Sequence, residues 1–444
     1  MTGTPTQAAR GGADERLSSL DIARSFAALA VVLYHWQHFQ FAGYALREGF
    51  DRTVQPLYAV LFPFYSGGWL AVDFFFMLSG YIFFWKYQAS VAAGAFGAGK
   101  FFVLRFSRLY PLHVVTLLAV AALQAVYFAR HGGFFVFPFN DLYHFGLQLF
   151  LASHWGLERG PSFNDPVWSL SVEVLLYALF FCLARYTRAR WPLLLAVSAL
   201  GFVIYGSNLS NAIGRGLFCF FIGGLLSYAL ATPPARHSRF EGAVYGAALL
   251  LIALALVAGG QIDVFAGTIA SLAAGLHSDL APLEAAVSNR LARVLSYAFI
   301  AGLLFPALIA SLVLIERRFH AQIQRWSFLG HISYSSYLLH IPLQLACVLL
   351  LPGFFTSPSS AASGPALLAF VVVLVALSFA SFYGFERPAQ TFIRRLAASA
   401  EGARRESRMR SQAWLDRWAD PGRGADSVAS ISADPAPTGA GSER

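Results

Sequence analysis

The sequence predicts an all-α, polytopic transmembrane helical bundle of about ten spanning helices, with both termini in the cytoplasm. Three observations predict this class. Of the 444 residues, 57% are hydrophobic and only 12% are charged, against about 45–50% and about 25% in a typical soluble domain. The apolar residues gather in blocks of membrane-spanning length, and most basic residues lie on alternate connections between these blocks. This composition excludes a soluble enzyme, a disordered scaffold and a nucleic-acid-binding protein.

Ten segments are apolar and about long enough, at about 1.5 Å per residue, to cross a hydrocarbon core of about 30 Å. We place them at 20–39, 67–86, 109–129, 168–185, 191–206, 212–230, 240–259, 292–315, 331–351 and 365–385. An eleventh apolar stretch, Leu142 to Trp155, is too short to span and carries two histidines. We expect an interfacial or re-entrant helix there.

The distribution of arginine predicts the orientation. The connections that hold Arg105, Arg108, Arg317 and Arg318 are rich in basic residues, whereas the alternate connections hold few, so the rich side is cytoplasmic by the positive-inside rule. Topology therefore explains much of the net charge of +9 without an anionic partner. Almost all basic residues are arginine, a bias typical of GC-rich bacterial genomes, and we expect a multi-pass protein of the bacterial cytoplasmic (inner) membrane.

The chain is expected to consist of three parts. Residues 1–16 form a disordered leader, 17–396 a transmembrane domain, and 397–444 a mostly disordered cytoplasmic tail. Within the tail, Arg404–Trp418 has the pattern of a short amphipathic helix. The first apolar segment is not expected to be a cleaved signal peptide, because acidic residues precede it and no small-residue cleavage site follows.

Ionisable side chains inside a span are costly, so each one is a functional candidate. Arg24 and His35 lie eleven residues apart, close to three helical turns, and project from nearly the same face. Arg24 lies at the cytoplasmic mouth and His35 about 16 Å further in. Asp73 lies at a similar depth to His35 and is a candidate partner for it, because an unpaired carboxylate there is poorly solvated. An interfacial arginine and a hydrogen-bonded core histidine are the structural alternative.

Arg105 and Arg108 lie three residues apart on one helix face, where both can bind a phosphate. On their own they fit a purely topogenic role, but with Arg24 they indicate a phosphate-bearing cytoplasmic ligand. Glu173 is either a functional carboxylate or a structural hydrogen-bond acceptor. His340 lies near the middle of its span and either takes part in the chemistry or stabilises the kink at Pro342.

Six sequence blocks in order resemble the membrane-bound acyltransferase family 3, over roughly residues 17–396. The blocks are Leu20-Asp-Ile-Ala-Arg with His35, Val72-Asp-Phe-Phe-Phe-Met-Leu-Ser-Gly, Arg105-Phe-Ser-Arg-Leu-Tyr-Pro, Trp168-Ser-Leu-Ser-Val-Glu, Ile332-Ser-Tyr-Ser-Ser-Tyr-Leu-Leu-His and Glu386-Arg-Pro. One departure is Ile22-Ala23, where the family often has Gly before a Leu. The Arg and His positions are unaffected by it.

The resemblance implies transfer of an acyl group, commonly acetyl, from a coenzyme A thioester to a hydroxyl of an extracytoplasmic glycan or lipid-linked saccharide. O-antigen and exopolysaccharide are typical acceptors. Acyl-CoA is then a donor substrate, and no permanently bound cofactor is expected. No metal is expected either, because no cluster has ligand spacing.

The resemblance also implies roles for particular residues. Coenzyme A phosphates would bind to Arg24, Arg105 and Arg108. His35 would act as general base or, alternatively, form an acyl-histidine intermediate. Either Asp73 or Glu173 would orient it. We expect the substrate site to be lined by Trp168, Ser171 and His340.

The main rival function is a transporter or flippase of a lipid-linked or organic substrate, since intramembrane charges suit it equally well. Against that function, no matched pair of broken apolar segments is visible in the sequence.

Overall fold

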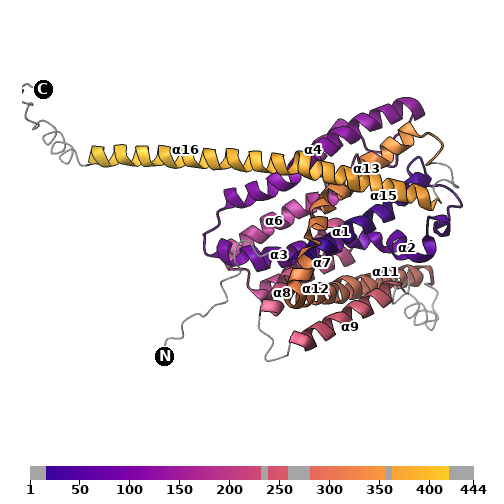
Figure 1. Cartoon of the computed structure of the whole chain (residues 1–444), viewed down its shortest axis with the longest axis horizontal. Helices are drawn as coiled ribbons and strands as arrows, with labels where there is room; N and C mark the ends of the chain where they lie inside the picture. The colour runs from indigo at the N-terminus through magenta and orange to yellow at the C-terminus, as the bar shows by residue number, and fades with distance from the viewer. Residues whose placement is uncertain (1–16, 232–238, 259–280, 356–362, 420–444) are drawn as a thin grey trace, which may run out of the picture. The chain divides into compact units, whose positions relative to one another are not determined.

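The computed structural model describes residues 17–231, 239–258, 281–355 and 363–419. The predicted leader lies outside them. Within the described residues the chain is almost wholly helical, and its strands form one short antiparallel hairpin of β1 (Phe41–Ala42) and β2 (Ala45–Leu46). The predicted all-α polytopic class is confirmed (Figure 1).

Apart from this hairpin, which lies between η1 and η2, the described elements are helices. In order they are α1 (Ser18–Tyr34), η1 (His35–Gln40), η2 (Arg52–Val54), α2 (Tyr58–Gly67), η3 (Gly68–Leu70), α3 (Ala71–Ala92), α4 (Ala98–His131), α5 (Leu142–Leu149), η4 (Asp165–Val167), α6 (Trp168–Thr187), α7 (Trp191–Gly206), α8 (Asn211–Ala231), α9 (Arg239–Ala258), α11 (Ala281–Phe299), η5 (Ile300–Leu304), α12 (Phe305–Gln324), η6 (Ser327–Ile332), α13 (Ser333–Leu350), α15 (Gly364–Ser381), η7 (Phe382–Glu386) and α16 (Arg387–Ala419). Here η5 and η7 are π-helical turns and the other η elements are 3₁₀ helices.

Each of the ten predicted spans coincides with a helix, but fewer satisfy the length and hydropathy of a complete span. Among the described residues, seven helices do so, and α7 is a shorter apolar helix. The helix α1 is not among them; its α-helical hydrogen bonding ends at Tyr34, where the chain tightens into η1. The stretch predicted to be too short for a span contains only the eight residues of α5.

The helix α1 lies at the centre of the helix packing. It packs against α2, α3, α12 and α13. Its first turn is capped by Glu316 of α12, whose carboxylate accepts hydrogen bonds from the N–H groups of Ser18 and Ser19 at 2.7 and 3.0 Å. A carboxylate there satisfies unpaired N–H groups and the positive end of the helix dipole. The cap fixes the position of α1 along its own axis, and with it that of its functional side chains.

The backbones of α3 and α8 approach closely, and glycines make this possible. A Cβ atom on Gly80 would lie 1.9 Å from the carbonyl oxygen of Phe220, and one on Gly223 would lie 2.1 Å from that of Met77. Small residues of this kind let transmembrane helices approach and interlock. The helix pair forms part of a large apolar cluster with α6.

The chain divides into two units at Pro388. In the second unit the helix α16 continues to Ala419, with ion pairs one turn apart between Glu401 and Arg405 and between Glu406 and Arg410. Such pairs favour a helix. Residues 397–419 are helical, including the stretch Arg404–Trp418 for which the sequence predicts a helix, and residues 420–444 of the expected tail lie outside the described part.

Candidate active site

The site begins with two histidines from different helices. His35 is the first residue of η1, directly after the last α-helical turn of α1, and His340 projects from α13. Nδ1 of His35 lies 3.0 Å from Nε2 of His340. The two rings are within 14° of parallel, with centroids 5.0 Å apart. His340 is fully buried, whereas His35 is only partly so.

A third histidine and a glutamine complete this cluster. Nδ1 of His38 lies 3.1 Å from Oε1 of Gln344, and Nε2 of Gln344 donates a hydrogen bond to the carbonyl oxygen of His35 at 2.9 Å. The His38 ring lies 4.7 Å from that of His35. Neither residue was predicted from the sequence, although His38 follows His35 by about one turn and Gln344 follows His340 by one turn.

Asp73 does not pair with His35, and the predicted partnership is wrong. The Asp73 carboxylate is fully buried and accepts hydrogen bonds from Nη2 and Nε of Arg215 at 2.6 and 2.9 Å, and from the Tyr297 hydroxyl at 2.9 Å. The guanidinium of Arg215 also stacks on Trp69 and Trp168. A buried carboxylate is stabilised most by a cation with matching donors, which Arg215 supplies and a neutral imidazole does not.

Glu173 is likewise engaged away from His35. Its Oε1 accepts hydrogen bonds from the hydroxyls of Tyr177 and, at 3.2 Å, Ser79. Glu173 also interacts electrostatically with Arg24. It therefore belongs to the arginine cluster described next, and neither predicted carboxylate orients His35 through a hydrogen bond in the described structure.

The three predicted arginines gather near Glu173. Arg24 forms an ion pair with Asp21 at 3.1 Å and interacts electrostatically with Arg108. Tyr177 interacts electrostatically with both Arg105 and Arg108. Like charges in proximity repel, so an arrangement of this kind suits an anionic ligand.

Arg105 is already positioned by aromatic side chains. It donates a hydrogen bond to the Tyr87 hydroxyl at 2.9 Å, and its guanidinium lies over the rings of Phe83 and Tyr87 at 5.0 and 5.1 Å. Its Nε atom is buried and has no hydrogen-bond partner among the described residues. A donor in that state can serve a bound oxyanion.

The remaining predicted residues, Trp168 and Ser171, contact the loop before α6. The ring of Trp168 packs against Phe76 and lies 5.9 Å from the ring of His154. The hydroxyl of Ser171 is buried and accepts a hydrogen bond from the N–H of His154 at 3.1 Å. Ser171 therefore holds the loop before α6, a role that its residue type alone does not indicate.

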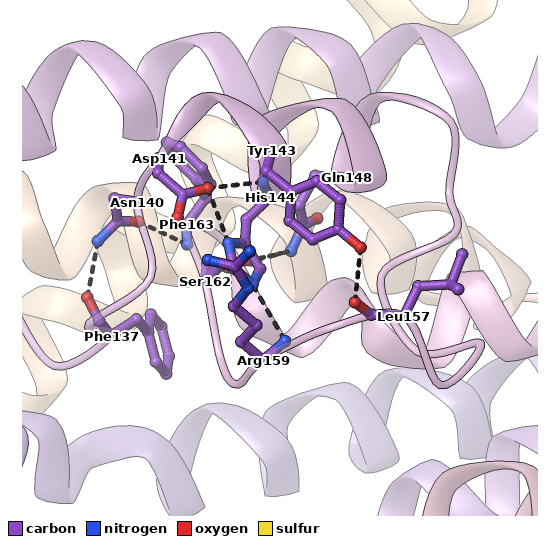
Figure 2. A network of polar contacts seen from close by, with 10 residues as sticks. All are labelled: Phe137, Asn140, Asp141, Tyr143, His144, Gln148, Leu157, Arg159, Ser162 and Phe163. Carbon is purple, nitrogen blue, oxygen red and sulfur yellow. Dashed lines mark hydrogen bonds and ion pairs between the residues drawn. The ribbon is translucent and has the colours of Figure 1, made fainter.

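The segment between α4 and α6 is held by its own polar network (Figure 2). Asp141 caps α5, accepting from the backbone N–H of His144 at 2.8 Å, and pairs with Nδ1 of the same residue at 2.8 Å. Nε2 of His144 accepts from the backbone N–H of Arg159 at 3.2 Å, and the Tyr143 hydroxyl donates to the Leu157 carbonyl at 2.8 Å. The backbone hydrogen bond from His144 lowers the pKa of Asp141. The stabilisation from this carboxylate is therefore present above its unfolded-state pKa and is lost as the pH falls through the lowered value.

The segment between α4 and α6 also contacts α13 near His340, at a carbonyl group affected by Pro342. Pro342 has no N–H, so the carbonyl of Leu338 lacks its usual helical donor. The side-chain Nδ2 of Asn164 donates to that carbonyl at 3.0 Å. The carbonyl that Pro342 leaves without a helical donor is thus paired by Asn164, a residue that was not predicted from the sequence.

Metal binding has no support from these clusters. Within the part of the chain that the structure describes, no group of three or more His, Cys, Asp or Glu side chains could hold a metal ion. The imidazoles of His35 and His340 bond to each other, and His38 is engaged by Gln344.

Comparison with known proteins gives a consistent result. A family described as an acyltransferase domain matches residues 17–383. "Protein 2 in picA locus" from Rhizobium radiobacter is 32% identical over 200 residues, which are 42% of this chain and 92% of that protein. "Acyltransferase MdmB" from Streptomyces mycarofaciens is 33% identical over 177 residues, which are 39% of this chain and 40% of that protein. No solved structure matches.

Proposed function

This chain belongs to the acyltransferase family and is an acyltransferase, and on that premise we propose that it moves an acyl group, most simply acetyl, from acyl-CoA to a hydroxyl of a glycan. The donor would bind from the cytoplasm, and the acceptor would be an extracytoplasmic polysaccharide or lipid-linked saccharide. The membrane would be the bacterial inner membrane. The arginine distribution and the apolar helices support this location.

One observation carries the proposal. Arg24 and His35 lie on the same short stretch of α1 and η1, with Arg24 in the arginine cluster and His35 in the histidine cluster. The helix rise separates them by about 16 Å. A donor whose phosphates bind at Arg24 can therefore extend its pantetheine arm along α1 and present its thioester near His35.

The chemistry needs one base and one anion-binding site. His35 removes the proton from the acceptor hydroxyl as its oxygen attacks the thioester carbonyl. The tetrahedral intermediate then collapses, the carbon–sulfur bond breaks, and the coenzyme A thiolate takes the proton from the His35 imidazolium. The products are an O-acyl ester and coenzyme A, and His35 returns to its starting state.

The carboxylates support this scheme without touching the base. Glu173 and Asp21 partly neutralise the arginine cluster when no donor is bound. Trp168 lies beside Arg215 and the loop before α6, and it is the candidate for stacking on an acceptor sugar ring.

A cellular assay tests the proposal. The wild-type chain, His35→Ala and the control His131→Ala are expressed at equal membrane abundance in a host that makes candidate polysaccharides. His131 is exposed at the end of α4, and its Nδ1 lies 3.0 Å from the carbonyl oxygen of Tyr127 in the same helix. We expect ester groups on the glycan with the wild type and the control, and none with His35→Ala, measured by NMR or mass spectrometry. Equal ester content in all three would remove His35 from the chemistry.

A further inference from the structure

We propose that His340 is the positioning residue of the site: it fixes which nitrogen of His35 carries the proton, and so which nitrogen acts as the base. This inference rests on the proposed function, because it takes His35 to be the general base. It replaces the carboxylate that the sequence analysis expected in this role with a neutral imidazole.

The directions of the hydrogen bonds follow from one carbonyl group. Nδ1 of His340 lies 2.7 Å from the backbone oxygen of Tyr337. A carbonyl oxygen only accepts, so Nδ1 of His340 carries the proton. A neutral imidazole has one N–H, so Nε2 of His340 is left with a lone pair.

That lone pair determines the state of His35. Nε2 of His340 lies 3.0 Å from Nδ1 of His35 and can only accept, so Nδ1 of His35 carries the proton. The lone pair of His35 therefore lies on Nε2, the nitrogen on the side of the ring away from His340. The chain of hydrogen bonds from Tyr337 through His340 to His35 thus prepares Nε2 of His35 to accept a proton.

The same arrangement survives the proton transfer. When Nε2 of His35 takes the proton of the acceptor hydroxyl, Nδ1–H continues to donate to His340, and no proton has to leave His340. A neutral partner performs this function without a second buried charge, whose desolvation is costly. The charge that develops on His35 is transient.

Neighbouring contacts hold His340 in place. Asn164 donates to the Leu338 carbonyl freed by Pro342, two residues from His340. The Tyr337 hydroxyl bonds to the Pro166 carbonyl and to the Ser169 hydroxyl at 2.5 and 2.8 Å. The turn of α13 that carries His340 is therefore fixed to the segment that leads into α6. Gln344, one turn after His340 on α13, donates a hydrogen bond to the His35 carbonyl.

Three substitutions at His340 separate positioning from packing. In His340→Gln the amide oxygen can still accept from Nδ1–H of His35, in His340→Ala nothing replaces the acceptor, and in His340→Lys only donors are present. The measurement uses purified protein in lipid nanodiscs with acetyl-CoA and an acceptor glycan. We expect kcat to be highest in the Gln variant, lower in the Ala variant and lowest in the Lys variant. The loss should reach at least about tenfold for Ala, while KM for acetyl-CoA stays within about twofold.

Equal loss of kcat in the Gln and Ala variants, or no loss in Ala, would overturn the proposal. In either case His35→Ala must still be inactive, so the proposed function would stand. A wild-type protein that transfers no acyl group to any acceptor would instead count against the proposed function itself.

A second measurement does not depend on the variants being folded. In wild-type protein with ¹⁵N-labelled histidine, NMR distinguishes the protonated from the unprotonated ring nitrogen, and the His35 signals are assigned by their absence in His35→Gln. We expect Nδ1 of His35 to be protonated and Nε2 not. The opposite tautomer would contradict the proposal whether or not activity is detected.

Discussion

At the residue scale, two groups of charged side chains in the described bundle have different kinds of neighbour. Asp73 and Arg215 neutralise each other through two hydrogen bonds between α3 and α8. Arg24 and Arg108, in contrast, are neighbours of like sign with carboxylates nearby. The charges of the first group balance each other without a ligand. The second group has a surplus of positive charge, which suits a phosphate-bearing donor.

The arginine cluster is expected to bind the donor. Replacing Arg24 or Arg108 with Ala should raise the Kd for acetyl-CoA about tenfold each, because each removes a charge-assisted hydrogen bond to a phosphate. Isothermal titration on the purified protein measures this, with Arg190→Ala, an exposed arginine before α7, as the control. Binding in the wild type should also weaken as salt rises. If acetyl-CoA binds equally well to all four proteins, these arginines only set topology.

The Asp73–Arg215 pair is expected to stabilise the helices rather than to catalyse. Asp73→Asn or Arg215→Met alone should cost about 3–5 kcal/mol, because each leaves a buried charge without its partner. The double variant should cost clearly less than the sum of the two. Thermal unfolding in a fixed detergent, followed by circular dichroism, measures the difference. Additive losses would show that the two side chains are not coupled.

At the element scale, the position of the site depends on how α1, α13 and the segment before α6 are held together. Glu316 caps α1, Pro342 interrupts the hydrogen bonds of α13, and Asn164 fills the resulting gap. Unpaired backbone groups are costly at membrane depth. A proline that frees a carbonyl therefore requires a donor from elsewhere, and here the donor comes from the loop beside the histidines.

A double substitution tests this connection. Asn164→Ala should destabilise the protein by about 1–3 kcal/mol, since it leaves the Leu338 carbonyl unpaired. In a Pro342→Ala background the restored backbone N–H can bond to Leu338, and Asn164→Ala should then cost much less. Thermal unfolding of the four proteins gives the coupling energy. The same cost in both backgrounds would mean that Asn164 acts through another contact.

Features that follow from the spacing of residues along one helix were predicted from the sequence. Features that depend on how two helices pack together were not. The relation of Arg24 to His35 follows from their spacing along α1, and apolar length located all ten helical segments. The partners of Asp73 and His35 could not be read in this way, because Arg215 and His340 lie 142 and 305 residues away. Pairing across the bundle depends on helix packing, such as the approach of α3 to α8 at Gly80, which no local pattern specifies.

At the scale of the whole molecule, α1 and η1 connect the arginine cluster to the histidine cluster, since Arg24 belongs to the first and His35 to the second. Under the proposed function, donor binding at Arg24 and chemistry at His35 are separated along α1 by about 16 Å of helix rise. The two functions should therefore be separable by substitution.

The most direct test of this account compares donor binding and a single turnover in His35→Ala. The purified variant in nanodiscs is titrated with acetyl-CoA and then mixed with acceptor glycan, and ester formation is followed over time. We predict a Kd within about twofold of the wild type and a transfer rate at least about 10²-fold lower. Transfer at the wild-type rate, or a loss of acetyl-CoA binding as large as that of Arg24→Ala, would contradict it.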